Sequence, residues 1–90
     1  MAFDVTYWVY MIQSASDNSI YTGITRDVST RISEHNSGKG AHRTRGRGPW
    51  SLLAAKKYVS KSAALKMEIR VKGRSHTGKL KLAREWLMVE

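Results

Sequence analysis

Cysteine is absent from the sequence of 90 residues, and this absence excludes several kinds of site at once. Disulfides, zinc ribbons, other thiolate metal sites and cysteine nucleophiles cannot form. Any metal ion must therefore be bound through oxygen or imidazole ligands. A chain without cysteine is also compatible with a reducing compartment, and we expect an intracellular, cytoplasmic protein.

Long apolar stretches are also absent. No segment approaches the roughly 20 apolar residues that a membrane-spanning helix needs, and Met1–Tyr7 lacks the basic start and apolar run of a secretory signal. The apolar stretches are too short for the continuous apolar face of a membrane-surface helix. We therefore expect no membrane partner. Because so short a chain can bury only one modest core, we also expect a single domain over residues 1–90.

Acidic residues are few. The chain has 7 Asp and Glu residues against 16 Lys and Arg residues, which gives a formal net charge of +9. Such an excess in a short chain predicts an anionic partner, and nucleic acid is the leading candidate. No Lys or Arg precedes Arg26, so the basic surface must lie outside the N-terminal segment.

Three segments have the aromatic and β-branched composition that is typical of strands. They are Tyr7–Gln13, Ile20–Thr25 and Trp50–Val59. The turn-rich sequence Ser14–Ser19 separates the first two and predicts a β-hairpin.

Three further segments have helical signals. The first begins after the N-cap residue Asp27 and ends near Gly38, and the second runs from about Ser62 to Lys72 and is ended by Gly73. The third is C-terminal, and its predicted core residues are Leu80, Ala83 and Leu87, with Trp86 beside them. The predicted order is ββαβαα, an α+β fold with a small three-stranded antiparallel sheet flanked by helices.

Two basic residues interrupt the apolar stripe of the first predicted helix. Arg31 and His35 share the i, i+3, i+4, i+7 spacing of Val28 and Ile32. Polar groups on an inward stripe are costly unless they are paired, placed in a cleft or bound to a metal. We therefore take Arg31 and His35 as candidate site residues.

The second predicted helix shows the same feature. Glu68 falls among Ala64, Leu65 and Ile69, which we expect to face inward. An ordinary ion pair between Glu68 and Arg31 at a helix interface is the structural alternative to a functional site.

The segment 38–49, called the basic loop below, is rich in Gly, Lys and Arg and has no acidic residue. Glycines let backbone amides approach phosphates, so we expect this loop to contact nucleic acid. Its candidate contacts are Lys39, His42, Arg43, Arg45 and Arg47. The alternative is a solvated, mobile connection, and His42 by itself is more typical of a solvent-exposed histidine.

Several motifs occur in a fixed order along the chain. They are Trp8-Val9-Tyr10, Tyr21-Thr22-Gly23, Arg31 with His35 one helical turn later, and Glu68 with Lys72 after it. Together they resemble the GIY-YIG nuclease superfamily, and the resemblance covers Tyr7 to Gly73. The first motif departs from Gly-Ile-Tyr and the second from Tyr-Ile-Gly, but both keep strand-compatible residues.

The resemblance implies a metal-dependent DNA endonuclease that hydrolyses phosphodiester bonds. The implied catalytic residues are Tyr10, Tyr21, Arg31, His35 and Glu68. Arg31 would bind the scissile phosphate, His35 would handle a proton or bind phosphate, and Glu68 would bind one divalent ion, Mg²⁺ or Mn²⁺. A single hydrated metal is expected because the other acidic residues lie at termini, turns or helix surfaces.

A tyrosine is the implied proton acceptor, and the sequence leaves open which one, with Tyr10 slightly favoured over Tyr21. A free phenol titrates near pH 10, so its phenolate would need stabilisation by Arg31, Lys72 and the metal. Lys72 is also a candidate nucleic-acid contact, although its i, i+4 spacing from Glu68 fits a simple salt bridge.

Residues 35–50 resemble two branches of the superfamily. One is the compact bacterial single-domain type, and the other is the nuclease domain of the eukaryotic enzyme that cuts branched DNA. The second carries a cysteine-rich zinc domain, for which this chain has neither cysteines nor length, so the compact bacterial type fits better. A bacterial protein of this type would be associated with the nucleoid.

The implied role is in DNA repair or recombination, with single-stranded or branched DNA as the expected substrate. A non-catalytic nucleic-acid-binding module is the alternative function. A basic structural protein, for example one associated with ribosomes, ranks third.

Overall fold

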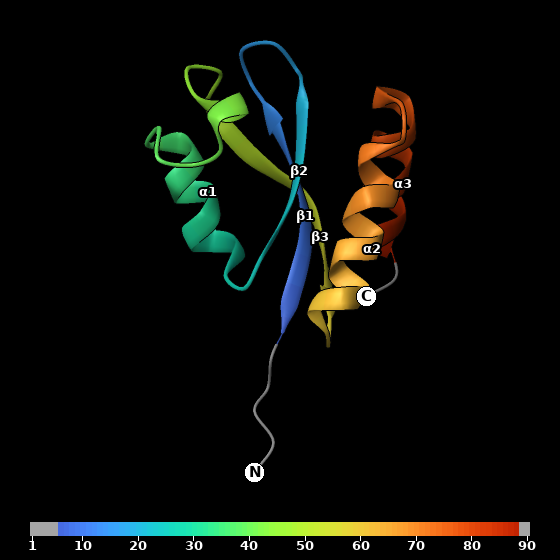
Figure 1. The fold of residues 1–90 in the computed structure, drawn as a ribbon. Coiled ribbons are helices and arrows are strands. Elements are labelled where there is room, and N and C mark those ends of the chain that lie inside the picture. Colours follow the sequence, from blue (N-terminus) through green and yellow to red (C-terminus); the bar gives the residue numbers. More distant parts are fainter. Residues whose placement is uncertain (1–5, 89–90) are drawn as a thin grey trace.

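The computed structural model describes residues 6–88 (Figure 1). The elements are β1 (Tyr7–Ser14), β2 (Ile20–Thr25), α1 (Val28–Asn36), the 3₁₀ turn η1 (His42–Thr44), β3 (Trp50–Tyr58), α2 (Lys61–Lys72) and α3 (His76–Met88). The predicted α+β class and the order ββαβαα are confirmed. The short turn η1 inside the basic loop is an addition that the sequence did not predict.

The sheet has the order β2-β1-β3, and both pairings are antiparallel. Tyr10 of the central strand pairs with Gly23 on β2 and with Ala55 on β3. The register with β3 shifts between Met11 and Ile12. Because β2 is an edge strand, one side of its backbone is open, and this edge is important for the site described below.

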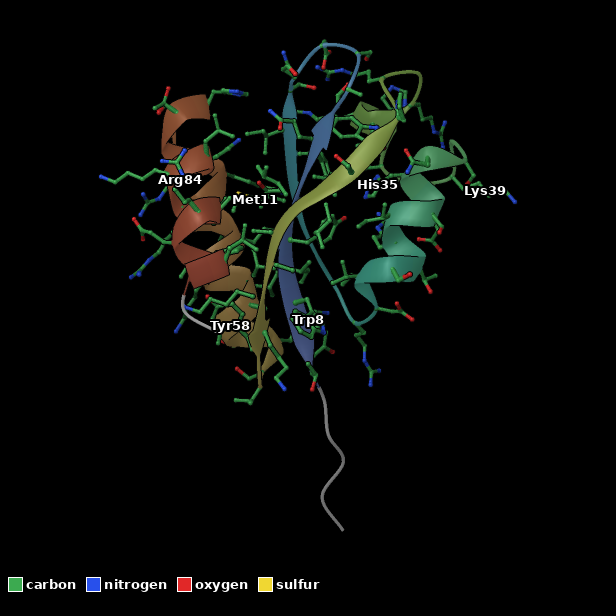
Figure 2. The ribbon with its side chains drawn as sticks, turned by 180° about the vertical axis from the view of Figure 1, so that it is seen from behind. Trp8, Met11, His35, Lys39, Tyr58 and Arg84 are labelled. Atoms are coloured by element: carbon green, nitrogen blue, oxygen red, sulfur yellow. The ribbon has the colours of Figure 1, made fainter. Side chains whose placement is uncertain are left out.

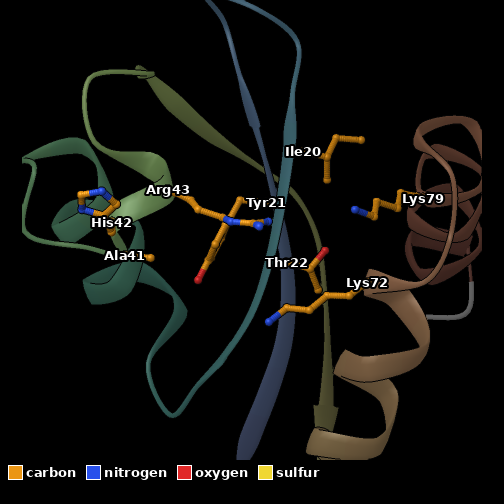
Figure 3. Close-up of a pocket in the computed structure, with 8 residues that line it drawn as sticks. All are labelled: Ile20, Tyr21, Thr22, Ala41, His42, Arg43, Lys72 and Lys79. Carbon is orange, nitrogen blue, oxygen red and sulfur yellow. The ribbon is translucent and has the colours of Figure 1, made fainter.

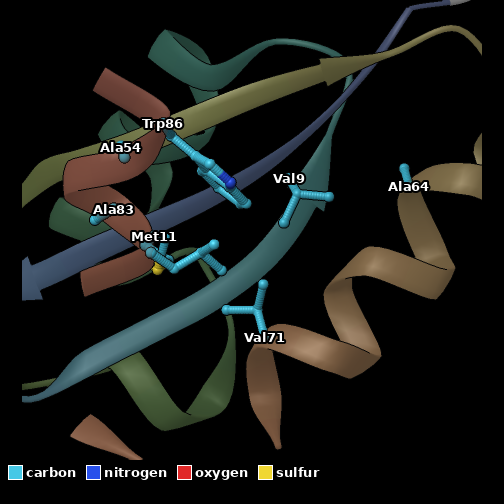
Figure 4. Close-up of a cluster of buried hydrophobic side chains, with 8 residues drawn as sticks. Val9, Met11, Ala54, Ala64, Val71, Ala83 and Trp86 are labelled. Atoms are coloured by element: carbon cyan, nitrogen blue, oxygen red, sulfur yellow. The ribbon is translucent and has the colours of Figure 1, made fainter. Parts of the chain in front are cut away.

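Helices cover both faces of the sheet: α1 lies on one face, and α2 and α3 lie on the other (Figure 1). Side chains alternate along β1, so Val9 and Met11 enter the larger core beneath α2 and α3 (Figure 4). Tyr10 and Ile12 belong to the smaller core on the α1 side, together with Trp50. Figure 2 shows Met11 and His35 on opposite sides of the sheet.

Side-chain caps fix the beginnings of α1 and α2. Asp27 is the N-cap of α1, as predicted, and its carboxylate accepts a hydrogen bond from Thr30 N. Ser60 caps α2 in the same way by accepting from Ala63 N. These caps set the rotation of each helix, and therefore which residues face the sheet.

The predicted inward stripe of α2 was partly wrong. Leu65 and Ile69 are exposed, whereas Ala64 and Val71 are buried. The buried stripe continues through the half-buried Met67 and Glu68, at the i, i+3, i+4, i+7 spacing that starts from Ala64. Glu68 therefore does face inward, but on a different stripe from the one predicted.

The predicted stripe of α3 needs a similar correction. Leu87 is exposed, and the buried residues are Leu82, Ala83 and Trp86. The stripe begins one position earlier than predicted and includes the half-buried Lys79. The aliphatic stem of a lysine can occupy such a position while its ammonium group reaches solvent.

Candidate active site

A tyrosine and a histidine meet at the α1 face of the sheet. Tyr10 projects from the central strand, and its Oη lies 2.8 Å from His35 Nε2. His35 comes from the last turn of α1 and is buried. The inward stripe predicted for α1 is thus confirmed, and the two residues form a direct hydrogen bond that sequence spacing did not predict.

The second nitrogen of His35 fixes the direction of this hydrogen bond. His35 Nδ1 lies 2.8 Å from Thr44 Oγ1, and the Thr44 hydroxyl donates to the carbonyl of Ala41 at 2.8 Å. Because the single hydroxyl proton of Thr44 is already donated to Ala41, Thr44 Oγ1 must accept a hydrogen bond from His35 Nδ1–H. His35 Nε2 is then an acceptor, and Tyr10 Oη–H donates to it.

Burial acts on the protonation of both residues. Burial and the nearby Arg31 lower the pKa of His35, which keeps the imidazole neutral at pH 7. Burial also raises the pKa of Tyr10 to about 12, and the Arg31 guanidinium beside the hydroxyl only partly opposes this rise. The phenolate that the sequence led us to expect is therefore unfavourable at Tyr10 in the free protein.

Two glycines make room for this pair. A Cβ at Gly23 would lie 2.7 Å from Tyr10 Oη, and a Cβ at Gly40 would lie 2.9 Å from the Cα of His35. Gly23 is the glycine of the Tyr-Thr-Gly motif. The structure needs glycine there because a side chain would overlap Tyr10. Gly40 has a similar role that the sequence did not reveal.

Tyr21 completes a group of three rings. Its ring centroid lies 5.1 Å from that of His35 and 6.4 Å from that of Tyr10. Tyr21 is half-buried, whereas Tyr10 is fully buried. The two tyrosines of the motifs therefore differ in access: the Tyr10 hydroxyl is enclosed, and Tyr21 lines a cleft.

Arg31 and Glu68 do not form the ion pair considered as the structural alternative. Arg31 Nη1 lies 2.9 Å from Glu34 Oε1, and Glu68 Oε2 lies 3.2 Å from Lys72 Nζ. The Glu68 side chain is only 15% exposed. Its negative charge is close enough to Tyr10 to contribute a small further rise of the Tyr10 pKa.

The helix α2, which carries Glu68, and the helix α1 cover opposite faces of the sheet (Figure 1). The open edge of β2 lies between these two helices. Arg31 therefore belongs to the α1 side of this edge, and Glu68 with Lys72 belongs to the α2 side. Among residues 6–88 there is no group of three or more His, Asp or Glu side chains that would hold a metal.

The basic loop is tied to the rest of the fold. The Asn36 side chain accepts from Trp50 N at 2.6 Å and donates to Trp50 O at 2.9 Å. The Trp50 indole donates to Thr44 O at 3.0 Å. These bonds hold Thr44 under His35, so the loop is part of the site.

Arg47 differs from the other predicted phosphate contacts. Its Nε and Nη2 donate to the Asp17 carboxylate at 3.3 and 3.1 Å, which joins the basic loop to the β1–β2 turn. Lys39, His42, Arg43 and Arg45 are exposed. Within the described part of the chain none of these four forms an ion pair.

A cleft of about 510 Å³ lies along β2, between η1 and the helices α2 and α3 (Figure 3). Tyr21 and Thr22 line it from the strand, His42 and Arg43 from the basic loop, and Lys72 and Lys79 from the helices. Three of the predicted nucleic-acid contacts, His42, Arg43 and Lys72, therefore share one cleft with Tyr21. Thr22 and Lys79 were not predicted.

The family model described as GIY-YIG catalytic domain matches residues 6–81, which include the tyrosine hairpin, the helix with Arg31 and His35 and the helix with Glu68. The chain belongs to the GIY-YIG family. The resemblance seen in the sequence is thereby confirmed, and the family is a nuclease superfamily.

The relatives are small proteins of similar length that carry only a family designation. UPF0213 protein OB0043 of Oceanobacillus iheyensis is 43% identical over 79 residues, which are 88% of this chain and 91% of the relative. UPF0213 protein H16_B0156 of Cupriavidus necator is 47% identical over 79 residues, 88% of this chain and 85% of the relative. These matches support the compact bacterial type.

Two solution NMR structures have the same fold. UPF0213 protein BH0048 from Bacillus halodurans is 44% identical, with a TM-score of 0.56 over 88% of this chain and 83% of that chain. Protein EF2693 from E. faecalis is 28% identical, with a TM-score of 0.67 over 100% of this chain and 95% of that chain. None of the helices within residues 6–88 is long and apolar enough to cross a membrane.

Proposed function

We propose that this GIY-YIG protein is a metal-dependent endonuclease that hydrolyses phosphodiester bonds in DNA. The observation that carries the proposal is the Tyr10–His35 hydrogen bond at 2.8 Å, beside Arg31 and at the strand edge that Glu68 approaches. A non-catalytic nucleic-acid-binding module would need the basic surface but not this buried pair.

The Tyr10–His35 pair accepts the proton of the attacking water. A free Tyr10 phenolate is disfavoured by a pKa of about 12, but Tyr10 can take a proton from water while it passes its own proton to His35 Nε2. The hydrogen bonds through Thr44 to Ala41 hold the imidazole in the tautomer that receives this proton. Charge then appears on His35, not on the phenol.

Arg31 binds the scissile phosphate. Its side chain is 31% exposed, and Glu34 holds the guanidinium in the position next to Tyr10. A phosphate at the β2 edge offers two oxygens to the planar donors of Arg31, which stabilise the charge that develops in the transition state. Because Tyr10 is buried, Arg31 must shift toward the phosphate to admit the reacting water to the Tyr10 hydroxyl.

Tyr21 has a different role from Tyr10 in this proposal. It lines the cleft and lies beside both His35 and Tyr10. From this position its hydroxyl can donate a hydrogen bond to the phosphate and keep it aligned with the water. Tyr21 is thus a positioning group, and Tyr10 is the proton acceptor.

Glu68 is the residue that would hold the divalent metal, Mg²⁺ or Mn²⁺. Its side chain faces inward and is only 15% exposed, and among the described residues its carboxylate forms an ion pair with Lys72 alone. One carboxylate suits a hydrated Mg²⁺, which binds few protein ligands and completes its shell with water and phosphate oxygens. The ion would supply Lewis-acid stabilisation of the phosphate and the leaving oxygen.

The substrate class is DNA that can bend into a short open cleft, which favours single-stranded or branched DNA and a role in repair or recombination. Arg43 lines the cleft, and Lys39 and Arg45 are exposed on the same basic loop. All three neutralise phosphates without reading bases. Single strands follow such a surface more readily than a stiff duplex.

The test is incubation with labelled single-stranded, duplex, flap and junction DNA, and with single-stranded RNA, in Mg²⁺, Mn²⁺ or EDTA. We expect cleavage of at least one DNA substrate with a metal and none in EDTA. Glu68→Gln should abolish cleavage, by about 1,000-fold or more, because an amide replaces the anionic ligand. It should leave DNA binding in EDTA within about twofold.

A melting curve of Glu68→Gln separates the catalytic from the structural interpretation. Loss of cleavage with an unchanged Tm supports the metal role. Normal turnover of Glu68→Gln, or binding of every substrate with no cut product in either metal, would reject the endonuclease and leave the binding module.

A further inference from the structure

A buried hydroxyl without a partner lies on the far side of β2 from Tyr10. Thr22 is 3% exposed, and its Oγ1 makes no hydrogen bond. Among the described residues only the hydroxyl of Tyr58 shares this condition. Burying a hydroxyl without a partner is unfavourable, so such a group points to a ligand that the free protein lacks.

The Thr22 hydroxyl belongs to the cleft of about 510 Å³ that Tyr21 also lines. Figure 3 shows Thr22 Oγ1 and the ammonium group of Lys79 pointing into the same space between β2 and α3. Lys72 reaches toward β2 from below in this view, and Arg43 reaches toward it from the basic loop. Three cations and one hydroxyl donor therefore converge on one cleft.

The three cations differ in how much of their charge is already used. Lys72 is paired with Glu68 at 3.2 Å. Within residues 6–88, Lys79 and Arg43 have no ion-pair partner. Lys79 is half-buried, at the start of the buried stripe of α3, so its position is set by packing and not only by solvent.

We propose that this cleft is a second phosphate subsite, in which Thr22 and Lys79 bind a phosphodiester next to the scissile one. This inference rests on the proposed function and adds the path of the DNA strand across the protein. The DNA strand runs from the scissile phosphate at Tyr21 and Arg31 across the open edge of β2. Its next phosphate lies between Thr22 and Lys79. Arg43 forms the outer wall of the cleft at this point.

The chemistry of the cleft suits a phosphate. A phosphate oxygen accepts from the Thr22 hydroxyl and from an ammonium group at the same time. Small shifts of the surrounding side chains must admit that oxygen, because Thr22 Oγ1 itself is buried. The subsite would fix the strand's direction across β2 and so place the scissile bond.

The test measures binding of a short single-stranded oligonucleotide in EDTA, so that cleavage plays no part. Thr22→Val keeps the shape and the β-branch, and Thr22→Ser keeps the hydroxyl. We expect Thr22→Val to weaken binding about tenfold and Thr22→Ser to bind within about twofold of the wild type. Thr22→Val should also melt at a higher temperature than the wild type, because it removes the unpartnered hydroxyl.

Lys79→Met and Lys81→Met form the second pair of variants. Both keep an apolar stem, but Lys81 is exposed and does not line the cleft. We expect Lys79→Met to reduce the slope of log affinity against log salt by about one unit, or somewhat less on a single strand, and Lys81→Met to leave it nearly unchanged. Equal effects of the two variants, or normal binding by Thr22→Val, would overturn the subsite.

Inorganic phosphate and 5′-phosphorylated oligonucleotides identify the source of the phosphate. If the subsite binds an internal phosphodiester, we expect oligonucleotides with and without a 5′-phosphate to bind with equal affinity. Inorganic phosphate should then bind weakly. A preference of tenfold or more for the terminal phosphate would overturn the assignment to an internal one. If the variants change binding as expected but the wild type never cuts DNA, the nuclease proposal fails and the subsite stands. If the wild type cuts DNA but Thr22→Val and Lys79→Met bind normally, the subsite fails and the nuclease proposal stands.

Discussion

The two sides of β2 differ in how completely their polar groups are satisfied. On the α1 side, Tyr10, His35 and Thr44 form an unbroken series of hydrogen bonds that ends at a backbone carbonyl. On the α2 and α3 side, Thr22 is buried without a partner beside Lys79. A site that performs a proton transfer benefits from fixed geometry, whereas a site that only binds can leave its donors unpaired until the ligand arrives.

The largest expected difference lies between the two tyrosines. Tyr10→Phe removes the hydroxyl that transfers a proton to His35, so we expect cleavage to fall by about 100-fold or more. Tyr21→Phe removes only a positioning hydrogen bond, so we expect a loss of about tenfold. Single-turnover rates at saturating DNA measure both. A larger loss for Tyr21→Phe would reverse the roles assigned to the two residues.

The fixed side should also be the less tolerant of added volume. A methyl group at position 40 would overlap His35, so Gly40→Ala should lower the free energy of unfolding by about 1 to 3 kcal/mol and reduce cleavage. Gly73→Ala is the control, because its nearest neighbours would lie 3.6 and 3.7 Å from the new Cβ. That control should change stability by less than about 1 kcal/mol. Denaturant unfolding compares the two, and an equal response would remove the steric role of Gly40.

The smallest expected effects separate two arginines of the basic loop. Arg45 is exposed, so Arg45→Ala should weaken DNA binding a few-fold, lower the salt slope by about one unit and leave the melting temperature unchanged. Arg47 is bonded to Asp17 across 30 positions of sequence. Arg47→Ala should therefore also lower the melting temperature, by an amount that Asp17→Asn reproduces. Identical melting of both arginine variants would contradict the structural role of Arg47.

The sequence was most informative where local spacing decides the structure. Asp27 and the stripe through Arg31 and His35 predicted α1 and its inward face correctly, because a cap and one apolar face define a short helix. For α2 and α3, apolar residues occur on more than one face. The sequence alone therefore did not show that Ile69 and Leu87 would be exposed.

The sequence was least informative where partners are distant and side chains decide. The spacing of Tyr10 and His35 gave no sign of their direct contact, nor of the Thr44 hydroxyl beyond it. Asn36 lies in the segment that resembles other family members, but nothing in the sequence showed that its side chain holds Trp50 and so shapes the basic loop. The unpaired hydroxyl of Thr22 is visible only once the strand is placed against the helices.

The most direct test of the account is the single-turnover cleavage rate as a function of pH. The pKa of His35 is lowered from its usual 6.5, and only neutral His35 can accept the proton. The rate should therefore fall with decreasing pH, by tenfold per unit, only below a midpoint that lies under about 6.5. Because the pKa of Tyr10 is about 12, the rate should then stay level from about pH 7 to 9, with Tyr10 protonated and His35 neutral throughout. A rate that continues to rise tenfold per unit toward pH 10 would instead show that a free phenolate or a hydroxide ion carries the reaction, and would contradict the Tyr10–His35 pair as the proton acceptor.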